Sequence, residues 1–150
     1  PEFIVWAQKD KYSASLQRVQ IIKGSIESGN ARPSEKVFDV VCSDGLEVDS
    51  TTHRCPDNGA RVSIEDCSIT DNVGATELKK IWKDPEFNPE DKAFYYVRVL
   101  ENPTCRWSTW DAIKAGEEPR SDLHKTIQER AWSSPIWYVP VPQDIDIFAL

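Results

Sequence analysis

The sequence predicts a mainly β protein: an antiparallel β-sandwich of immunoglobulin-like character, with two short helices and a long disulfide-stapled loop. Three observations predict this fold. Several short segments alternate polar and apolar residues, the connections between them are too short or irregular for repeated βαβ crossovers, and a polar stretch over residues 43–69 is bounded by cysteines. The 150 residues fit one sandwich domain, expected over residues 1–140, with residues 141–150 as a C-terminal tail.

The central strand of the sheet is expected over residues 93–100. Aromatic and β-branched residues occupy both faces of its pleat, as is typical of a strand with neighbours on both sides. Only Arg98 interrupts the apolar pattern. A charge in that position must be paired, reach water along its stem, or contact a ligand or partner.

Alternating patterns predict further strands over residues 3–8, 16–23, 37–41, 126–132 and 135–139. Gly24 is expected to end the second strand, and residues 30–34 are expected to form a loop before the third. This pattern gives about six strands, mostly antiparallel.

Two short helices complete the predicted fold. Ala75, Leu78, Ile81 and Trp82 fall at helical spacing, so residues 74–83 are expected to form an amphipathic helix that ends at the following Asp-Pro pair. Residues 108–115 are expected to form the second helix. Its Ser108 is the expected N-cap, Gly116 lies past its C-terminus, and Trp110 and Ile113 share its buried face.

The four cysteines, Cys42, Cys55, Cys67 and Cys105, allow three disulfide pairings. We prefer Cys42 with Cys55, which closes a short loop, and Cys67 with Cys105, which ties that loop region to the end of the central strand. Free thiols stay open as an alternative. A zinc site is not expected, because there is no CxxC pair and the chain has only two histidines. Disulfides favour an oxidising compartment, so we expect a periplasmic or extracellular location.

The formal net charge of -7 argues against a nucleic-acid or acidic-membrane partner, although a local basic patch is compatible with that total. No apolar run approaches the length of a membrane helix, and no signal peptide is visible at the N-terminus. The chain starts at Pro1 and contains no methionine, so we expect it to be a piece of a longer protein. Its oligomeric state is left open.

No catalytic constellation is visible in the sequence. His53 and His124 lie in separate polar loops, and there is no G-x-S-x-G motif, so both are interpreted as surface histidines. An acidic cluster in the stapled loop offers oxygen atoms to Ca²⁺ but lacks EF-hand spacing, which favours a solvated loop. The cluster consists of Asp44, Asp49, Asp57, Asp66 and Asp71. We therefore expect no catalytic residue, cofactor or metal ligand in this chain.

Five residues are candidates for contact with a partner or ligand: Arg98, Arg130, Trp107, Trp132 and Trp137. Surface tryptophans stack on sugars and peptides, but packing in the core or against another domain is the favoured interpretation for the six tryptophans of the chain. The two arginines are expected to pair with an acidic group such as Glu129 or Asp111, or to stack on a tryptophan.

Four segments carry a resemblance to a known family: residues 16–24, 84–89, 93–103 and 127–138. Across residues 3–138 the chain resembles the C-terminal part of a large bacterial family catalogued as a domain of unknown function. The N-terminal part of that family resembles metal-dependent phosphoesterases of the polymerase and histidinol phosphatase (PHP) type. The resemblance implies that the histidine-rich metal site lies upstream, so no residue here inherits it, and it also implies export from the cytoplasm.

These observations together predict a non-catalytic C-terminal accessory module of a secreted or periplasmic PHP-like protein of unknown substrate. The upstream catalytic domain of the same polypeptide is its expected partner, and any divalent metal is expected there. The alternative is a stand-alone module that binds a carbohydrate or peptide through exposed tryptophans.

Overall fold

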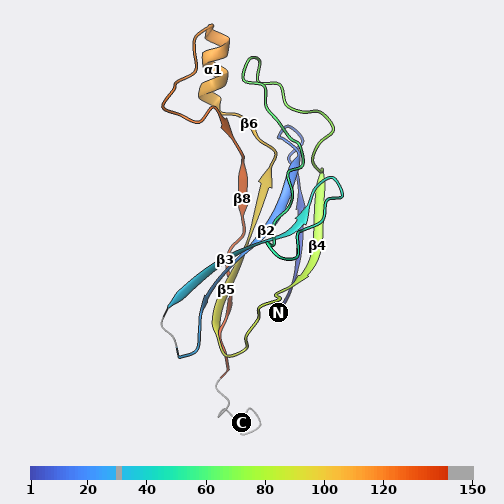
Figure 1. The fold of residues 1–150 in the computed structure, drawn as a ribbon, viewed down its shortest axis with the longest axis vertical. Coiled ribbons are helices and arrows are strands. Elements are labelled where there is room, and N and C mark those ends of the chain that lie inside the picture. The colour runs from blue at the N-terminus through green and yellow to red at the C-terminus, as the bar shows by residue number, and fades with distance from the viewer. Residues whose placement is uncertain (30–31, 142–150) are drawn as a thin grey trace.

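The computed structural model describes residues 1–29 and 32–141, which form an elongated, mainly β molecule built from antiparallel sheets (Figure 1). Most of the tail expected over 141–150 lies outside the described residues. Within the described part there is one helix, α1 (Trp107–Ala115), and no helix is long and apolar enough to cross a membrane. The strands are β1 (Glu2–Gln8), β2 (Leu16–Ile26), β3 (Pro33–Cys42), β4 (Glu77–Lys83), β5 (Lys92–Glu101), β6 (Thr104–Cys105), β7 (Thr126–Ile127), β8 (Arg130–Trp132) and β9 (Ile136–Tyr138).

The large sheet has the order β3-β2-β5-β8, and β9 pairs with the other end of the same edge of β5 that β8 occupies. Strand β5 therefore has neighbours on both sides: β2 along its whole length on one side, and β8 and then β9 on the other. The prediction of a central strand over residues 93–100 is confirmed. Its mixed aromatic and β-branched composition fits a strand that is covered on both edges.

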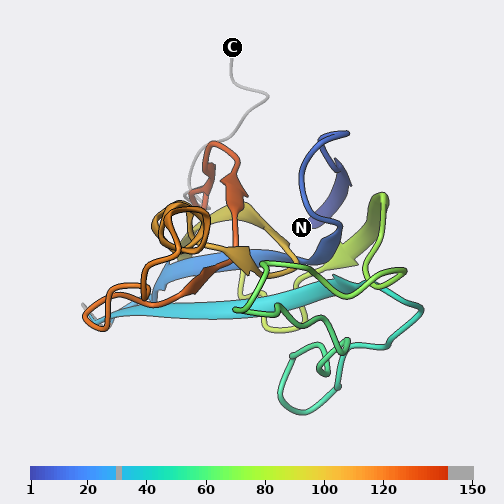
Figure 2. The same cartoon turned by 90° about the horizontal axis from the view of Figure 1, so that it is seen from above.

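Strands β1 and β4 form a second, two-stranded sheet that packs on one face of the large sheet, called here the inner face. Figure 2 shows this small sheet beside the large one, with the long teal and green loop projecting from the other side. The ring of Phe3 from β1 lies 4.8 Å from that of Tyr95, and Trp82 from β4 lies 5.3 Å from Phe38. The mainly β, antiparallel prediction is confirmed, with a sandwich-like arrangement of two facing sheets. The buried core consists of Val5, Leu16, Val19, Ile21, Phe38, Val40, Leu78, Ala93 and Tyr95.

A buried polar contact joins the two sheets at one end of this core. Lys23 Nζ donates a hydrogen bond to Asp84 Oδ2 at 2.6 Å, and the hydroxyl of Tyr95 donates to the same oxygen at 2.7 Å. Burial would by itself raise the pKa of the Asp84 carboxyl, but the hydrogen bonds from Lys23, Tyr95 and the Glu86 amide outweigh it and hold that pKa below its ordinary value. Asp84 is therefore a buried carboxylate whose charge is matched by Lys23.

The prediction of a helix over residues 74–83 is wrong, because Glu77–Lys83 is strand β4. Its seven residues pair in unbroken register with Glu2–Gln8. Leu78 and Trp82 point to the core while Ile81 points away from it. In a segment this short, the spacing of Leu78, Ile81 and Trp82 does not separate a helix from a strand. Pairing with β1 makes the segment a strand.

Gly24 does not end β2, which continues to Ile26. The ring of Phe94 on the neighbouring strand lies directly over Gly24, so a Cβ atom at this position would meet Phe94 Cζ at 2.2 Å. Glycine is needed here for close approach and not as a strand breaker. Strand β3 correspondingly begins at Pro33, inside the expected loop over 30–34.

The last third of the chain departs from the predictions in two further details. The strand expected over residues 126–132 is divided into β7 and β8, which belong to different sheets. Helix α1 confirms the second expected helix and its left-handed Gly116, but its N-cap is Arg106, without a side-chain cap, rather than Ser108. Trp110 is 41% exposed and Ile113 is half-buried, so the expected buried face of this helix is only partly covered.

The long segment between β3 and β4 is held by two disulfides. Cys42 is joined to Cys55 with 5.7 Å between their Cα atoms, and Cys67 is joined to Cys105 with 5.6 Å. These are the preferred pairs of the sequence analysis. Since the segment buries few apolar side chains of its own, the two covalent links and the hydrogen bonds of its aspartates hold it in place.

Candidate functional site

The face of the large sheet opposite the small sheet, called here the outer face, carries four of the five contact residues that the sequence singled out. Residues that pair directly across antiparallel strands share a face, as do residues two apart along a strand. Arg98 pairs with Gln20 on one side and with Trp132 on the other. One step further along the strands, Arg18 and Arg130 both pair with Leu100. Arg18, Arg98, Arg130 and Trp132 therefore share the outer face.

A chain of hydrogen bonds crosses this face. Arg98 Nε donates to Gln20 Oε1 at 2.7 Å, and Gln20 Nε2 donates to the buried Asp39 at 2.5 Å. Asp39 also accepts from the amide of Cys55 at 2.7 Å and lies 3.7 Å from the guanidinium groups of Arg18 and Arg54. Arg98 is thus anchored through Gln20, rather than through Glu129 or Asp111.

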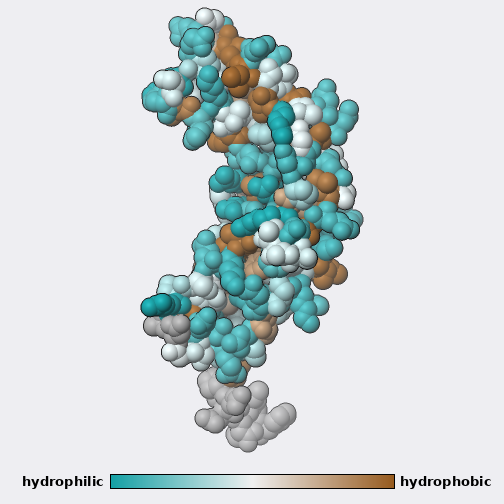
Figure 3. Space-filling view, viewed as in Figure 1, coloured by the Kyte–Doolittle hydropathy of each residue, from teal (hydrophilic) through white to brown (hydrophobic). Residues whose placement is uncertain are grey.

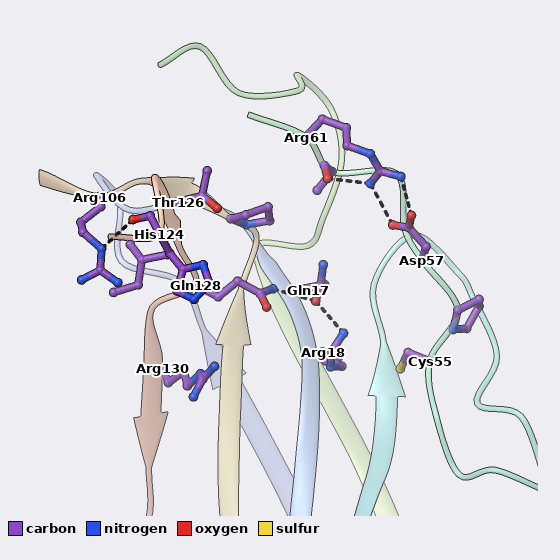
Figure 4. A pocket seen from close by; sticks show the side chains of 14 residues that line it. Gln17, Arg18, Cys55, Asp57, Arg61, Arg106, His124, Thr126, Gln128 and Arg130 are labelled. Carbon is purple, nitrogen blue, oxygen red and sulfur yellow. Dashed lines mark hydrogen bonds and ion pairs between the residues drawn. The ribbon is translucent and has the colours of Figure 1, made fainter. Parts of the chain in front are cut away.

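A concave site of about 570 Å³, called here the arginine cleft, opens at the end of the outer face near α1. Figure 4 shows Arg18 and Arg130 on strands of the large sheet, Arg106 on one side of the opening and Arg61 on the other. A second hollow of about 370 Å³ adjoins it, shares Arg18 with it, and adds Arg54 and Arg98. These six are most of the arginines of the chain, the other two being Arg32 and Arg120.

The charge along these two hollows is positive, although the chain as a whole is acidic. Their acidic lining residues are Asp39 and Asp57. Asp57 is occupied by Arg61, and the hydrogen bonds from Arg61 and the Gly59 amide lower the pKa of Asp57 to about 2. Across physiological pH both Asp57 and Arg61 stay ionised, and their opposite charges cancel. The other arginines therefore leave an excess of positive charge.

Several of these guanidinium groups have nitrogen atoms without a partner among the described residues. Arg106 is held through Nε, which donates to the carbonyl oxygen of His124 at 2.9 Å. Arg130 is exposed and has no hydrogen-bond or ion-pair partner in the described part of the chain. Arg18 Nε makes no hydrogen bond there, but it is buried and lies 3.7 Å from Asp39 Oδ2, so it is not offered to a ligand. The cleft therefore presents donors that protein atoms do not use.

The other end of the outer face is aromatic. Phe94 lies 5.2 Å from Trp137 and stacks on Tyr96 at 6.3 Å, as centroid distances. Trp137 is 70% exposed, and a groove of about 650 Å³ runs between it and Ile26. The outer face thus changes from basic at the cleft to apolar at the far end.

The structure brings most of the predicted contact residues together. Arg98, Arg130, Trp132 and Trp137 lie on the outer face, and Trp132 is 58% exposed directly beside Arg98. Trp107 does not join them, because it projects from α1 and is exposed. Cys42, Cys55, Cys67 and Cys105 form the two disulfides described above, and the first of these lies at the edge of the cleft through Cys55.

Sequence reasoning missed Arg18, Arg54, Arg61 and Arg106. They come from β2, the long loop and the start of α1, and no motif or spacing connects them. Their shared signal is the residue type: all are arginine, and the described lining of both hollows contains no lysine.

The histidines and the acidic loop have local roles in the described structure. His53 packs on Phe38 with ring centroids 5.1 Å apart, whereas His124 lines the arginine cleft. Asp49 and Asp66 each accept hydrogen bonds from residues two or three positions further on. Within residues 1–29 and 32–141, no three His, Cys, Asp or Glu side chains converge as metal ligands.

Fold and face together define the class of this protein: a disulfide-linked, antiparallel β module with an arginine-lined cleft on its outer face. The chain belongs to the family described as Protein of unknown function (DUF3604), whose family model matches residues 1–140. Neither the search of curated proteins nor that of solved structures gave a match.

Proposed function

We propose that this chain is a non-catalytic accessory module of a larger exported protein and that it packs on a neighbouring domain of the same polypeptide. The observation that carries the proposal is the outward face of the small sheet. Ile4 pairs directly with Ile81, and Trp6 follows on the same side of β1. These three side chains are 79%, 64% and 67% exposed.

A sheet face that meets water normally carries polar residues at these alternating positions. Burying three large apolar side chains stabilises a contact by about 1.5–3 kcal/mol for each one. A contiguous exposed patch of this kind marks an interaction surface. Figure 3 shows further hydrophobic residues on the surface near α1. Trp107 of this helix is also 74% exposed.

The expected partner is the upstream PHP-like domain that the family resemblance implies, and the export of the whole protein is part of the same proposal. Two disulfides are consistent with an oxidising, extracellular or periplasmic location. Any metal-dependent phosphoester chemistry of the longer protein is assigned to that upstream domain.

The test compares the isolated chain with the longer natural polypeptide that contains it. We expect the double variant Ile4→Ser/Trp6→Ser to leave the melting temperature of the isolated chain nearly unchanged, because both side chains are exposed. In the longer protein it should speed amide hydrogen exchange in β1 and β4. Tyr12→Ser, which removes an 89% exposed aromatic outside the sheets, is the matched control. Equal exchange in β1 for the unsubstituted chain alone and in the longer protein would refute the docking.

The non-catalytic part is tested by assaying the isolated chain on phosphoester substrates with Mn²⁺ or Zn²⁺. We expect no turnover above that of the metal alone. Metal-dependent turnover that co-purifies with the folded chain would contradict the proposal.

A second candidate function, a stand-alone module that binds a carbohydrate or peptide, is favoured by one observation. Trp132 and Trp137 are both exposed on the outer face, with Phe94 and Tyr96 between them. Quenching of tryptophan fluorescence by neutral oligosaccharides, lost in Trp137→Ala, would support this second function.

A further inference from the structure

We infer that the arginine cleft and its neighbouring hollow bind a short acidic oligosaccharide, a sugar chain that carries carboxylate or sulfate groups. The inference rests on the arginines of the outer face and does not depend on docking to another domain. It differs from the second candidate function because the charge of the sugar, and not only its rings, is recognised.

The residue type is the first argument. Arginine presents a planar fork of N–H groups that matches the oxygen atoms of a carboxylate or sulfate in a bidentate way, which lysine does not. Six arginines line the two hollows, and the described lining contains no lysine. A surface that only needed positive charge would use both residue types, of which the chain has 18 in total.

The second argument is that the protein orients these forks before any ligand arrives. Arg98 and Arg106 are each fixed through Nε, to Gln20 Oε1 at 2.7 Å and to His124 O at 2.9 Å. Their terminal NH₂ groups make no hydrogen bond to the described residues. Fixing a long side chain beforehand removes part of the entropy cost of binding.

The spacing of the arginines gives the third argument. Arg98 lies one paired row away from Arg18 and Arg130, which is about 7 Å along the strands, and Arg18 and Arg130 are two strands apart, about 10 Å. One small anion cannot meet all three. A ligand with at least two anionic groups along a short chain can.

Trp132 distinguishes a sugar from other anions. It is 58% exposed and pairs directly with Arg98, so an apolar ring surface lies beside the guanidinium groups. The C–H face of a sugar ring packs on such a surface while its acidic group reaches the neighbouring arginine. A tetraglutamate has no ring with a flat C–H face to pack on this tryptophan.

The net charge of -7 selects a short ligand. A long polyanion, including nucleic acid, would extend from the basic hollows over an acidic surface and be repelled there. A sugar of a few residues fits within the two hollows of about 570 and 370 Å³.

The experiment is calorimetric titration of the folded, disulfide-bonded chain with five probes of similar length. They are a tetragalacturonate, a sulfated tetrasaccharide, a neutral cellotetraose, a tetraglutamate and a tetranucleotide. We expect binding of at least one of the two acidic tetrasaccharides, weakened in high salt because the contacts are ionic.

Substitutions then locate the site. Arg130→Gln should weaken binding by about 10- to 100-fold, which corresponds to the loss of one charge-assisted hydrogen-bonded pair. Because Arg130 has no partner in the described chain, this variant should keep the melting temperature of the unsubstituted protein. Arg120→Gln, which removes an exposed arginine held by Asp122 outside both hollows, is the matched control and should bind within twofold of the unsubstituted chain.

A second pair of variants tests the sugar ring. Trp132→Ala should weaken binding of the acidic tetrasaccharide by about 2- to 10-fold through lost ring packing. Trp137→Ala, at the far aromatic end of the same face, should leave it within twofold.

Four outcomes overturn the inference. They are no binding of either acidic tetrasaccharide, unchanged affinity in Arg130→Gln, tetraglutamate or tetranucleotide binding as tightly as the sugar, and cellotetraose binding as tightly as its acidic counterparts. The last result would support the second candidate function instead.

Discussion

Asp84 shows at the scale of single residues how this protein tolerates charge in its interior. Its side chain is fully buried and Lys23 is 8% exposed, so both groups have lost most of their water. Such a pair is costly to form, but removing one partner is worse, because the other charge then stays buried without compensation. Tyr95 and the Glu86 amide satisfy the remaining oxygen positions of the carboxylate.

We expect Asp84→Asn to lower the free energy of unfolding at neutral pH by about 3–5 kcal/mol, because Lys23 stays buried and charged without its counterion. Glu86→Gln is the control, since Glu86 and its partner Lys36 are 39% and 51% exposed and such a pair contributes about 0–1 kcal/mol. Urea denaturation of both variants measures the difference. Equal small effects would show that the buried contact does not stabilise the fold.

The same prediction has a pH dependence. The folded-state pKa of Asp84 lies below its ordinary value, so its stabilising contribution is complete above the unfolded pKa of about 4 and is lost as pH falls through the folded pKa. The stability gap between the unsubstituted chain and Asp84→Asn should therefore be constant from pH 7 to about 5 and shrink below about pH 4. A gap that widens on acidification would contradict this assignment.

Among the elements, strand β2 contributes residues to both faces of the large sheet. Its inward residues Val19 and Ile21 belong to the core, while Arg18 and Gln20 organise the basic part of the outer face. Gly24, further along the same strand, leaves room for the ring of Phe94. One strand thus supports packing on one side and a binding surface on the other.

Gly24 contacts Phe94, so whether Gly24→Ala stabilises or destabilises the protein should depend on the residue at position 94. Gly24→Ala should destabilise the protein by about 1–3 kcal/mol, because the new Cβ displaces the Phe94 ring. In a Phe94→Ala background the same change should stabilise by about 0.5–1 kcal/mol, since alanine is less flexible than glycine in a strand. A double-mutant cycle by urea denaturation measures the coupling. Additive effects would mean that the two residues do not touch.

The whole molecule combines a packed centre with a covalently held end. The two-sheet core occupies the middle, whereas α1, β6, β7 and the part of the long loop around Cys67 extend beyond it at one end (Figure 1). The buried part of α1 is limited to Thr109. The disulfide between Cys67 and Cys105 joins the long loop to β6 at this end, and it substitutes there for a hydrophobic core.

Loop-closure entropy predicts the contribution of each disulfide. Removing Cys42–Cys55, with a sequence separation of 13, should cost about 3 kcal/mol, and removing Cys67–Cys105, with a separation of 38, about 4 kcal/mol. Paired Cys→Ser variants in urea measure both. Hydrogen exchange should show that loss of Cys67–Cys105 loosens α1 and β6 before the large sheet. A larger loss of protection in β2 and β5 than in α1 would contradict this division of the molecule.

The sequence by itself determined the features that depend on neighbours along the chain. The run of aromatic and β-branched residues on both faces of residues 93–100 was enough to predict the central strand, and Gly116 was enough to end the helix before it. The mainly β, antiparallel class followed from patterns of the same local kind. The preferred disulfide pairs followed from where the cysteines lie relative to the polar loop and the central strand.

The tertiary structure alone decided which distant segments meet. Glu77–Lys83 is a strand because β1 is its partner, although its apolar spacing also fits a helix. The arginine cleft exists because the register of β2, β5 and β8 places Arg18, Arg98 and Arg130 on one face. The physical reason is that hydrophobic period is a local property of a chain, whereas the pairing and register of strands depend on contacts between distant residues, such as Leu16 with Glu101.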